Sequence, residues 1–182
     1  MQRWSLVLLC WAQLAQAQPP TCPGFPDTSG HSLLARLRAL PPVGIDEERD
    51  SCPPATVTSL VHGAGDLCLF NGEVLAAMAA VTALASDATV VEYNYLLPYA
   101  PAAHARLLAI LDKKYARLPV QQAPAHLRAP VRGQETTAFF DGGAWLVALG
   151  KPTQGDPAGW YSNIIFESRA HPALGLRKRC QP

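Results

Sequence analysis

An alanine-rich stretch near the middle of the chain constrains the fold more than any other feature. Residues 72–86 contain no proline, and Glu73 is their single charged side chain. Asn71 is suited to cap a helix start, and Glu73 would lie where the helix dipole favours an acid. A membrane span is the competing interpretation, but the run is shorter than the about 20 residues that a bilayer requires. Because a helix that is apolar on nearly every side belongs inside a domain, the stretch predicts a central core helix over residues 72–86.

The first 17 residues carry the pattern of a secretory signal peptide. Arg3 precedes an apolar run over residues 4–14, and Ala15 and Ala17 supply the small-x-small pattern that signal peptidase recognises. An uncleaved anchor is the alternative, although the apolar run is short for one. We therefore expect a secreted, extracellular protein that begins at Gln18 and has no transmembrane segment after cleavage.

Cleavage at this position would remove Cys10 and leave an even number of cysteines. Two disulfides suit an oxidising compartment, although four cysteines permit three pairings and the sequence does not choose among them. Cys52 with Cys68 would close a short loop, and Cys22 with Cys180 would then join the two ends of the chain. No two of these cysteines have the close spacing of a zinc site, so we expect neither a metal nor another cofactor.

Length and charge set the number of domains and exclude one class of partner. The mature chain is long enough for one domain with its own core. Loss of Arg3 reduces the 15 lysines and arginines to 14, which equals the 14 acidic residues. A chain without excess positive charge is not expected to bind nucleic acid. The acidic residues gather before residue 100 and the basic residues after it, so the two halves either attract each other or present separate faces to partners.

Turn-forming residues dominate residues 18–54, which we interpret as a proline-rich, irregular N-terminal arm. We expect one short helix over residues 32–40 and a solvated acidic patch over residues 46–50. The arm would wrap an α+β domain that spans residues 55–182.

The rest of the chain shows strand patterns and one amphipathic helix. Residues 55–61 and 89–97 predict strands, the second of them half-buried because polar and apolar residues alternate. Residues 102–118, bounded by prolines, predict a helix, and residues 121–133 read as a linker.

A hairpin and a last strand complete the predicted sheet. Residues 136–140 and 144–149 flank a turn at Asp141, Gly142 and Gly143, and residues 160–166 predict the final strand. The predicted fold class is α+β: a single disulfide-bonded domain with a mostly antiparallel sheet and two main helices packed on one side.

Residues with catalytic chemistry are scattered. The sequence His62-Gly63-Ala64-Gly65 resembles the glycine-rich oxyanion loops of esterases, but no G-x-S-x-G motif follows it. No H-x-x-x-H or H-E-x-x-H pair would place two imidazoles on one face of a helix. We therefore assign no catalytic residue and expect a protein that is not an enzyme.

Aromatic residues in the last third of the chain are the candidate contact residues. In strands they normally fill a core, but one face could line a pocket or form an exposed contact patch. The candidate ligand or partner face comprises Trp145, Trp160 and Phe166. We expect a secreted, non-enzymatic protein that acts by binding another extracellular protein. The alternatives are a carrier of a small apolar ligand and a secreted hydrolase with an unrecognised site.

Overall fold

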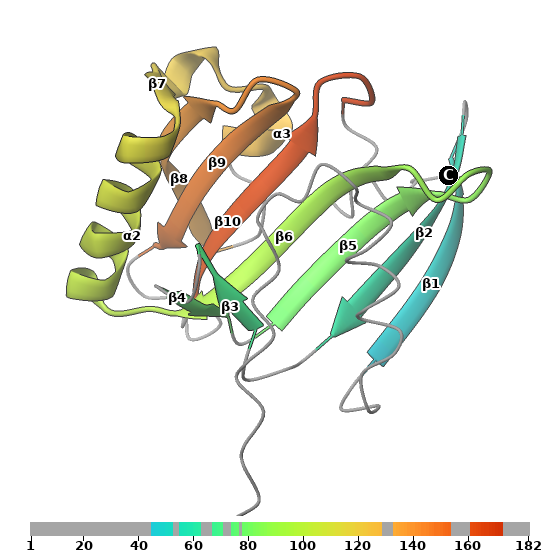
Figure 1. The fold of residues 1–182 in the computed structure, drawn as a ribbon, viewed down its shortest axis with the longest axis horizontal. Coiled ribbons are helices and arrows are strands. Elements are labelled where there is room, and N and C mark those ends of the chain that lie inside the picture. The colour runs from blue at the N-terminus through green and yellow to red at the C-terminus, as the bar shows by residue number, and fades with distance from the viewer. Residues whose placement is uncertain are drawn as a thin grey trace, which may run out of the picture.

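An antiparallel sheet of eight strands organises the part of the chain that the structure describes (Figure 1). The structure is a computed structural model and describes residues 45–52, 55–62, 67–70, 74–76, 78–128, 133–153 and 161–172. The strands of this sheet are β1 (Ile45–Cys52), β2 (Ala55–His62), β5 (Met78–Leu84), β6 (Val90–Pro98), β7 (Ala116–Leu118), β8 (Gln134–Asp141), β9 (Trp145–Pro152) and β10 (Tyr161–Ser168). The other elements are strands β3 (Leu67–Leu69) and β4 (Val74–Ala76), helices α2 (Pro101–Lys114) and α3 (Ala125–Arg128), and the short 3-10 helix η1 (Val120–Gln122).

Two four-stranded halves make up the large sheet. The first half has the order β1-β2-β5-β6 and the second the order β10-β9-β8-β7, with β6 and β10 paired in the middle. All neighbouring strands are antiparallel, and β3 and β4 form a separate two-stranded ribbon. The described part of the chain is therefore mostly antiparallel sheet with few helices, which agrees with the coarse α+β prediction.

The central helix predicted over residues 72–86 is wrong, because this stretch forms strands β4 and β5. Strand β5 pairs with β2 on one side and with β6 on the other. Strand β5 is buried on one face and partly covered on the other, so its sequence shows the same apolar run as a buried helix. The helix preference of alanine is too weak to decide between them. The period of two is visible in Ala79, Val81 and Ala83, which alternate along β5 and are at most 1% exposed.

Helix α2 covers one face of the sheet, which we call the α2 face. Its buried side chains, Leu107, Ile110 and Leu111, pack in one cluster with Tyr93 of β6 and Phe166 of β10. The end of β3 closes another part of the same cluster through Leu69 and the following residue, Phe70, which are at most 1% exposed.

The predicted end of this helix is also wrong. The helix stops at Lys114, and Tyr115 is already extended, with φ −132° and ψ 148°. The residues that were expected to be its last turn form the edge strand β7 and pair with β8. The side chain of Tyr115 still packs edge-on against Phe166, with 6.0 Å between ring centroids, and burial raises the pKa of Tyr115 to about 12.

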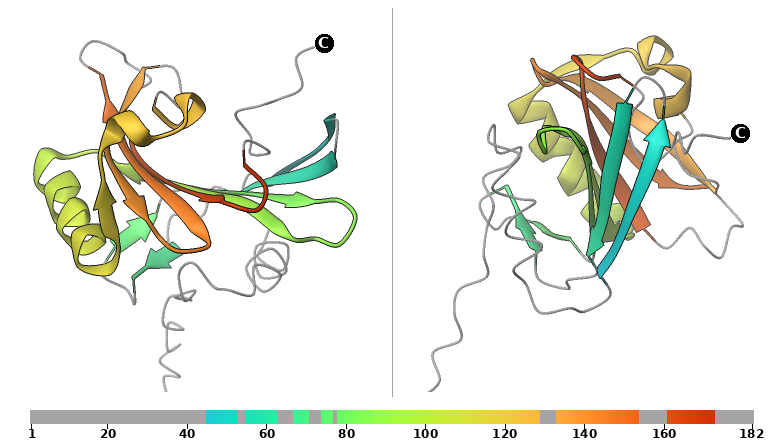
Figure 2. Two further views of the ribbon diagram at one scale, coloured as in Figure 1. Left: turned by 90° about the horizontal axis from the view of Figure 1, so that it is seen from above. Right: turned by 90° about the vertical axis from the view of Figure 1, so that its right-hand side faces the viewer.

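The opposite side of the sheet, which we call the α3 face, is covered in part by η1 and α3 (Figure 2). Leu127 of α3 is fully buried against Phe139, Ala148 and Ile165, which come from the three strands β8, β9 and β10. The prediction of two main helices on one side is wrong, because residues 78–84 of the first predicted helix form strand β5 and the short helix α3 lies on the face opposite α2. The segment predicted as a linker, residues 121–133, contains helix α3, which covers the α3 face.

The hairpin prediction is confirmed by strands β8 and β9. Gly143 adopts φ +75°, the left-handed conformation that favours glycine, and its N–H donates to the carboxyl of Asp141 at 2.8 Å. This contact and the Arg169 guanidinium, 2.9 Å away, hold the pKa of Asp141 below its usual value. The strands predicted over residues 55–61, 89–97 and 160–166 correspond to β2, β6 and β10.

The predicted N-terminal arm is not irregular throughout. Residues 45–52, which include the expected acidic patch, form strand β1 and pair with β2 over its whole length. The predicted signal peptide, the rest of the arm and its expected helix over residues 32–40 lie outside the described residues. Within the described ranges, no helix is long and apolar enough to cross a membrane.

Candidate functional site

Strand β10 is contacted from both sides by histidines. Its alternating side chains place Ser162, Ile164 and Phe166 on the α2 face, and Asn163, Ile165 and Glu167 on the α3 face. His104 reaches the first set from α2, and His126 reaches the second set from α3.

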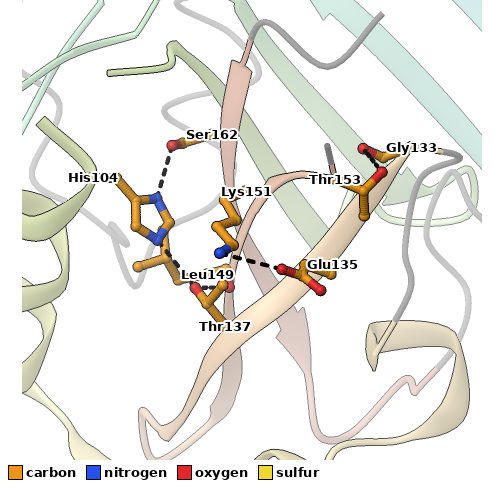
Figure 3. A network of polar contacts seen from close by, with 8 residues as sticks. All are labelled: His104, Gly133, Glu135, Thr137, Leu149, Lys151, Thr153 and Ser162. Carbon is orange, nitrogen blue, oxygen red and sulfur yellow. Dashed lines mark hydrogen bonds and ion pairs between the residues drawn. The ribbon is translucent and has the colours of Figure 1, made fainter. Parts of the chain in front are cut away.

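On the α2 face, His104 bridges three elements (Figure 3). Its Nδ1 lies 2.9 Å from the Ser162 hydroxyl, and its Nε2 lies 3.1 Å from the Thr137 hydroxyl. Since Thr137 donates its own proton to the carbonyl of Leu149, it accepts from Nε2–H, and Ser162 donates to Nδ1 when the second ring nitrogen carries no proton. This pattern requires a neutral imidazole. Burial, and secondly the positive charge of Lys151, lower the pKa of His104 in agreement with it.

This arrangement does not make a catalytic triad. Both nitrogens of His104 are occupied by hydroxyl groups, so no carboxyl group orients the ring as it does beside a serine nucleophile. Ser162 is 2% exposed, and the nearby Lys151 pairs instead with Glu135 at 3.3 Å. The contacts anchor helix α2 to strands β8 and β10.

On the α3 face, His126 donates from Nε2 to Oε2 of Glu167 at 2.7 Å. The Glu167 side chain is 1% exposed, whereas the His126 side chain is 20% exposed. A second contact links the same short helix to the sheet, because the Thr136 hydroxyl donates to the carbonyl of Leu127. The carboxyl and the serine that a triad would need beside one histidine therefore lie on opposite faces of the sheet.

Polar side chains form a row across four strands on the α3 face. The strand register places Glu167 opposite Glu92, Glu92 opposite Thr82, and Thr82 opposite Ser59. Directly opposite residues in antiparallel strands have Cβ atoms about 4.5–5.5 Å apart. The hydroxyls of Ser59 and Thr82 lie 3.3 Å apart, and all four residues are at most 2% exposed.

Several polar atoms on this face are buried without a hydrogen-bond partner in the part of the chain that the structure describes. They are Oδ1 of Asn94, Oε1 of Gln134, both side-chain polar atoms of Asn163, and Oε1 of Glu167. An unpaired buried polar group costs about 1–3 kcal/mol. Such groups are uncommon in folded proteins and call for a ligand, a water or another explanation.

Asn163 lies directly over Gly150 of strand β9, its partner in the register. A Cβ on Gly150 would collide with the amide group of Asn163. Glycine at this position therefore makes room for a polar side chain that is fully buried.

Strand β1 ends the sheet on the other side. It pairs with β2, and no described strand pairs with its second edge. Its eight residues, IDEERDSC, include four acids and one arginine. Figure 1 shows β1 as the outer strand of the first half of the sheet.

The structure does not bring the residues predicted as a ligand or partner face together on one exposed surface. Phe166 is fully buried on the α2 face, and Trp145 is partly buried on that face, 5.2 Å from the Tyr93 ring centroid. Trp160 lies outside the described residues.

Of the predicted disulfide cysteines, Cys22 and Cys180 lie outside the described residues. Cys52 ends β1 and Cys68 lies in β3, but their side chains are not described, so the disulfides stay a prediction.

The polar α3-face residues were missed because their pattern was read as a solvated strand face. Glu92 and Asn94 alternate with apolar residues, a pattern typical of a strand with one side in water. A signal was present in Asn163, a polar residue that directly precedes the apolar run Ile164, Ile165 and Phe166 in the predicted strand. Among the described residues, no cluster of three or more His, Cys, Asp or Glu could hold a metal ion.

No protein-family model, curated protein or solved structure matches this chain.

Proposed function

We propose that the protein is a secreted, non-enzymatic binding protein that acts on another extracellular protein through the outer edge of β1. The supporting observation is an eight-residue edge strand with no strand on its second side among the described residues. The backbone N–H and C=O groups of such an edge can pair with an extended segment of another chain.

The charge of β1 indicates which segment would bind. Four acids and one arginine give residues 45–52 a net charge of −3. A second copy of the same strand would be repelled, because like charges in facing strands destabilise the pair. The expected partner segment is therefore extended and rich in lysine or arginine, and its binding should weaken as salt rises.

A synthetic peptide of alternating lysine and valine tests this proposal on the full mature protein. Hydrogen exchange should slow in residues 45–52 when the peptide binds. A control peptide of the same composition plus a central proline should not protect them, because proline cannot complete the backbone ladder. Equal protection by both peptides would contradict strand addition.

Charge-reversed variants separate the edge from general attraction. Replacing both Glu47 and Glu48 with Lys should weaken peptide binding about tenfold or more. A matched variant with Asp112→Lys and Glu135→Lys carries the same charge change on exposed sites outside β1, and should bind within about threefold of the wild type. Equal losses in the two variants would overturn the proposed site.

Secretion has its own test. N-terminal sequencing of protein collected from the medium should begin at Gln18, and intact mass should rise by four hydrogens on reduction if two disulfides are present. Retention of Met1, or a mass unchanged by reduction, would contradict these two expectations separately.

A further inference from the structure

Helix α2 and the strand β7 that follows it carry a positively charged surface at the outer side of the described fold (Figure 1). Residues 101–128 contain five lysines and arginines but a single acid, Asp112, so this segment has a net charge of +4. Four of the five cations are exposed on α2 and β7, and we call them the cationic ridge. They are Arg106, Lys113 and Lys114 of α2, and Arg117 of β7.

The cationic ridge follows a line along α2. Arg106 and Lys113 are seven residues apart, so both lie on one side of the helix, separated by two turns or about 10.5 Å. Ala102 and Ala109 lie on the same line, and all four residues are exposed. An alanine methyl group is too short to hinder an approach to the two long cationic side chains. A partner with negative charges repeated along its length therefore fits this line better than one small anion does.

These charges are not neutralised within the part of the chain that the structure describes. Lys151 and Arg169, on other elements, each lie within 3.3 Å of a carboxyl oxygen. Arg106 and Lys113 form no ion pair with a described residue. The dipole of α2 accounts for Lys113 in the last turn, but not for Arg106, which lies two turns earlier. An anionic partner would supply the missing counter-charge.

We propose that the cationic ridge binds a linear sulfated polysaccharide. Sulfate groups recur along such a chain, and each contact with a lysine or arginine releases counterions from the charged polymer. Basic segments such as residues 113–117 are typical of patches that bind heparin or nucleic acid. The choice of a polysaccharide over a nucleic acid rests on the extracellular location proposed above, whereas the ridge itself does not depend on that location.

An anionic membrane fits the cationic ridge less well. Helices that bind membranes place an apolar side between the lipids. The apolar side of α2 is instead buried against the sheet, through Leu107, Ile110 and Leu111. Only the charged side of the helix is therefore open to a partner.

Heparin is the probe for this site on the full mature protein. Calorimetric titration should show binding whose logarithmic affinity falls linearly with the logarithm of the salt concentration. Heparin stripped of its sulfate groups should bind at least about tenfold more weakly, because much of its charge is gone. Equal binding of the two forms would overturn the proposal, and duplex DNA that binds as tightly as heparin would contradict the choice of a sulfated polysaccharide.

Two double variants with the same change of charge locate the site. Arg106→Gln with Lys113→Gln should weaken heparin binding about tenfold or more and reduce the salt slope by about 1–2, because two contacts are lost. Lys151→Gln with Arg169→Gln removes two cations that already have carboxyl partners, and should leave affinity within about threefold. Equal losses in the two variants would contradict a site on the ridge.

A gain of affinity keeps the proposal testable if a double variant does not fold. Asp112 is exposed and lies 3.6 Å from the Arg117 guanidinium. Asp112→Asn removes the one acid beside the ridge and leaves Arg117 for the polymer, so heparin binding should strengthen about twofold to fivefold. Unchanged or weaker binding would contradict the proposal.

The heparin experiments are also independent of the proposed partner site on β1. Heparin should leave hydrogen exchange in residues 45–52 unchanged, because this acidic strand repels a polyanion. Slower exchange there would contradict a site confined to the ridge. A failed peptide experiment on β1 would leave this proposal standing, and the reverse also holds.

Discussion

The two faces of the β6-β10 strand pair are both buried, yet they carry opposite kinds of side chain. On the α2 face, Tyr93 and Phe166 lie opposite each other within an apolar cluster that helix α2 covers. At the next pair of the register, Glu92 and Glu167 lie opposite each other on the α3 face, each 1% exposed. The difference shows that alternation along a strand marks two faces, but does not by itself say which one is in water.

The polar atoms of the two faces are also used differently. On the α2 face, His104 joins Ser162 and Thr137 in a chain of hydrogen bonds that ends at a backbone carbonyl. On the α3 face, His126 satisfies one oxygen of Glu167, and the other has no partner in the described part of the chain. We therefore expect the α2 face to supply most of the stability.

The largest expected effect is on the α2 face. Phe166→Ala should lower the free energy of unfolding by about 3–5 kcal/mol, because it empties a fully buried aromatic site between the sheet and Tyr115. Urea denaturation measures the change. Ala109→Ser on the exposed side of α2 is the control and should stay within about 0.5 kcal/mol. A loss below about 1 kcal/mol for Phe166→Ala would show that this face is not tightly packed.

The next effect tests the contact between Asn163 and Gly150 on the α3 face. Gly150→Ala should cost about 1–3 kcal/mol, because the new methyl group collides with the Asn163 amide. Adding Asn163→Ala removes the colliding atoms, so the double variant should be more stable than the sum of the two single changes predicts. Strict additivity in urea denaturation would contradict this geometry.

A smaller effect separates satisfied from unsatisfied polar groups on that face. Thr136→Val removes a hydroxyl that donates to the Leu127 carbonyl, and should cost about 0.5–1.5 kcal/mol. Asn94→Leu removes an amide oxygen that has no partner among the described residues, and should be neutral or stabilising. Thermal unfolding of the two variants measures the contrast. A greater loss for Asn94→Leu would show that its oxygen is already satisfied.

The smallest effect is a dependence of stability on pH through His104. Because its pKa is lowered in the folded state, the unfolded chain binds more protons once the pH falls below about 6.5, so stability decreases as the pH falls. The decrease levels off below the folded-state pKa, and above pH 6.5 the contribution is fully present. His104→Gln should flatten the decrease measured by urea denaturation between pH 7 and 5. An unchanged pH profile in His104→Gln would contradict the neutral bridge.

Some elements could be predicted from the sequence because their signals are local. Gly143 marks the β8-β9 turn, and Pro101 marks the start of α2. Strand β5 could not be predicted in this way, because its alanines suit a buried helix equally well and only its pairing with β2 and β6 decides.

The candidate site depended on information that the local pattern lacks. Burial of Glu92 and Asn94 results from what covers the α3 face, and the approach of Glu92 to Glu167 depends on residues 75 positions apart meeting in register. The acidic run of β1 was likewise read as a solvated patch, since charge is common both in loops and on edge strands.

Measurement of nuclear Overhauser contacts across β6 and β10 tests the central claim most directly. The account predicts contacts between Tyr93 and Phe166, between Glu92 and Glu167, and between Val81 and Tyr93. It also predicts slow amide exchange in β6 and β10. Sequential helical contacts over residues 78–84 would contradict the sheet, because these residues would no longer form strand β5. A β6-β10 register shifted by one residue would also contradict the account, because it would remove Glu92 and Glu167 from the same face.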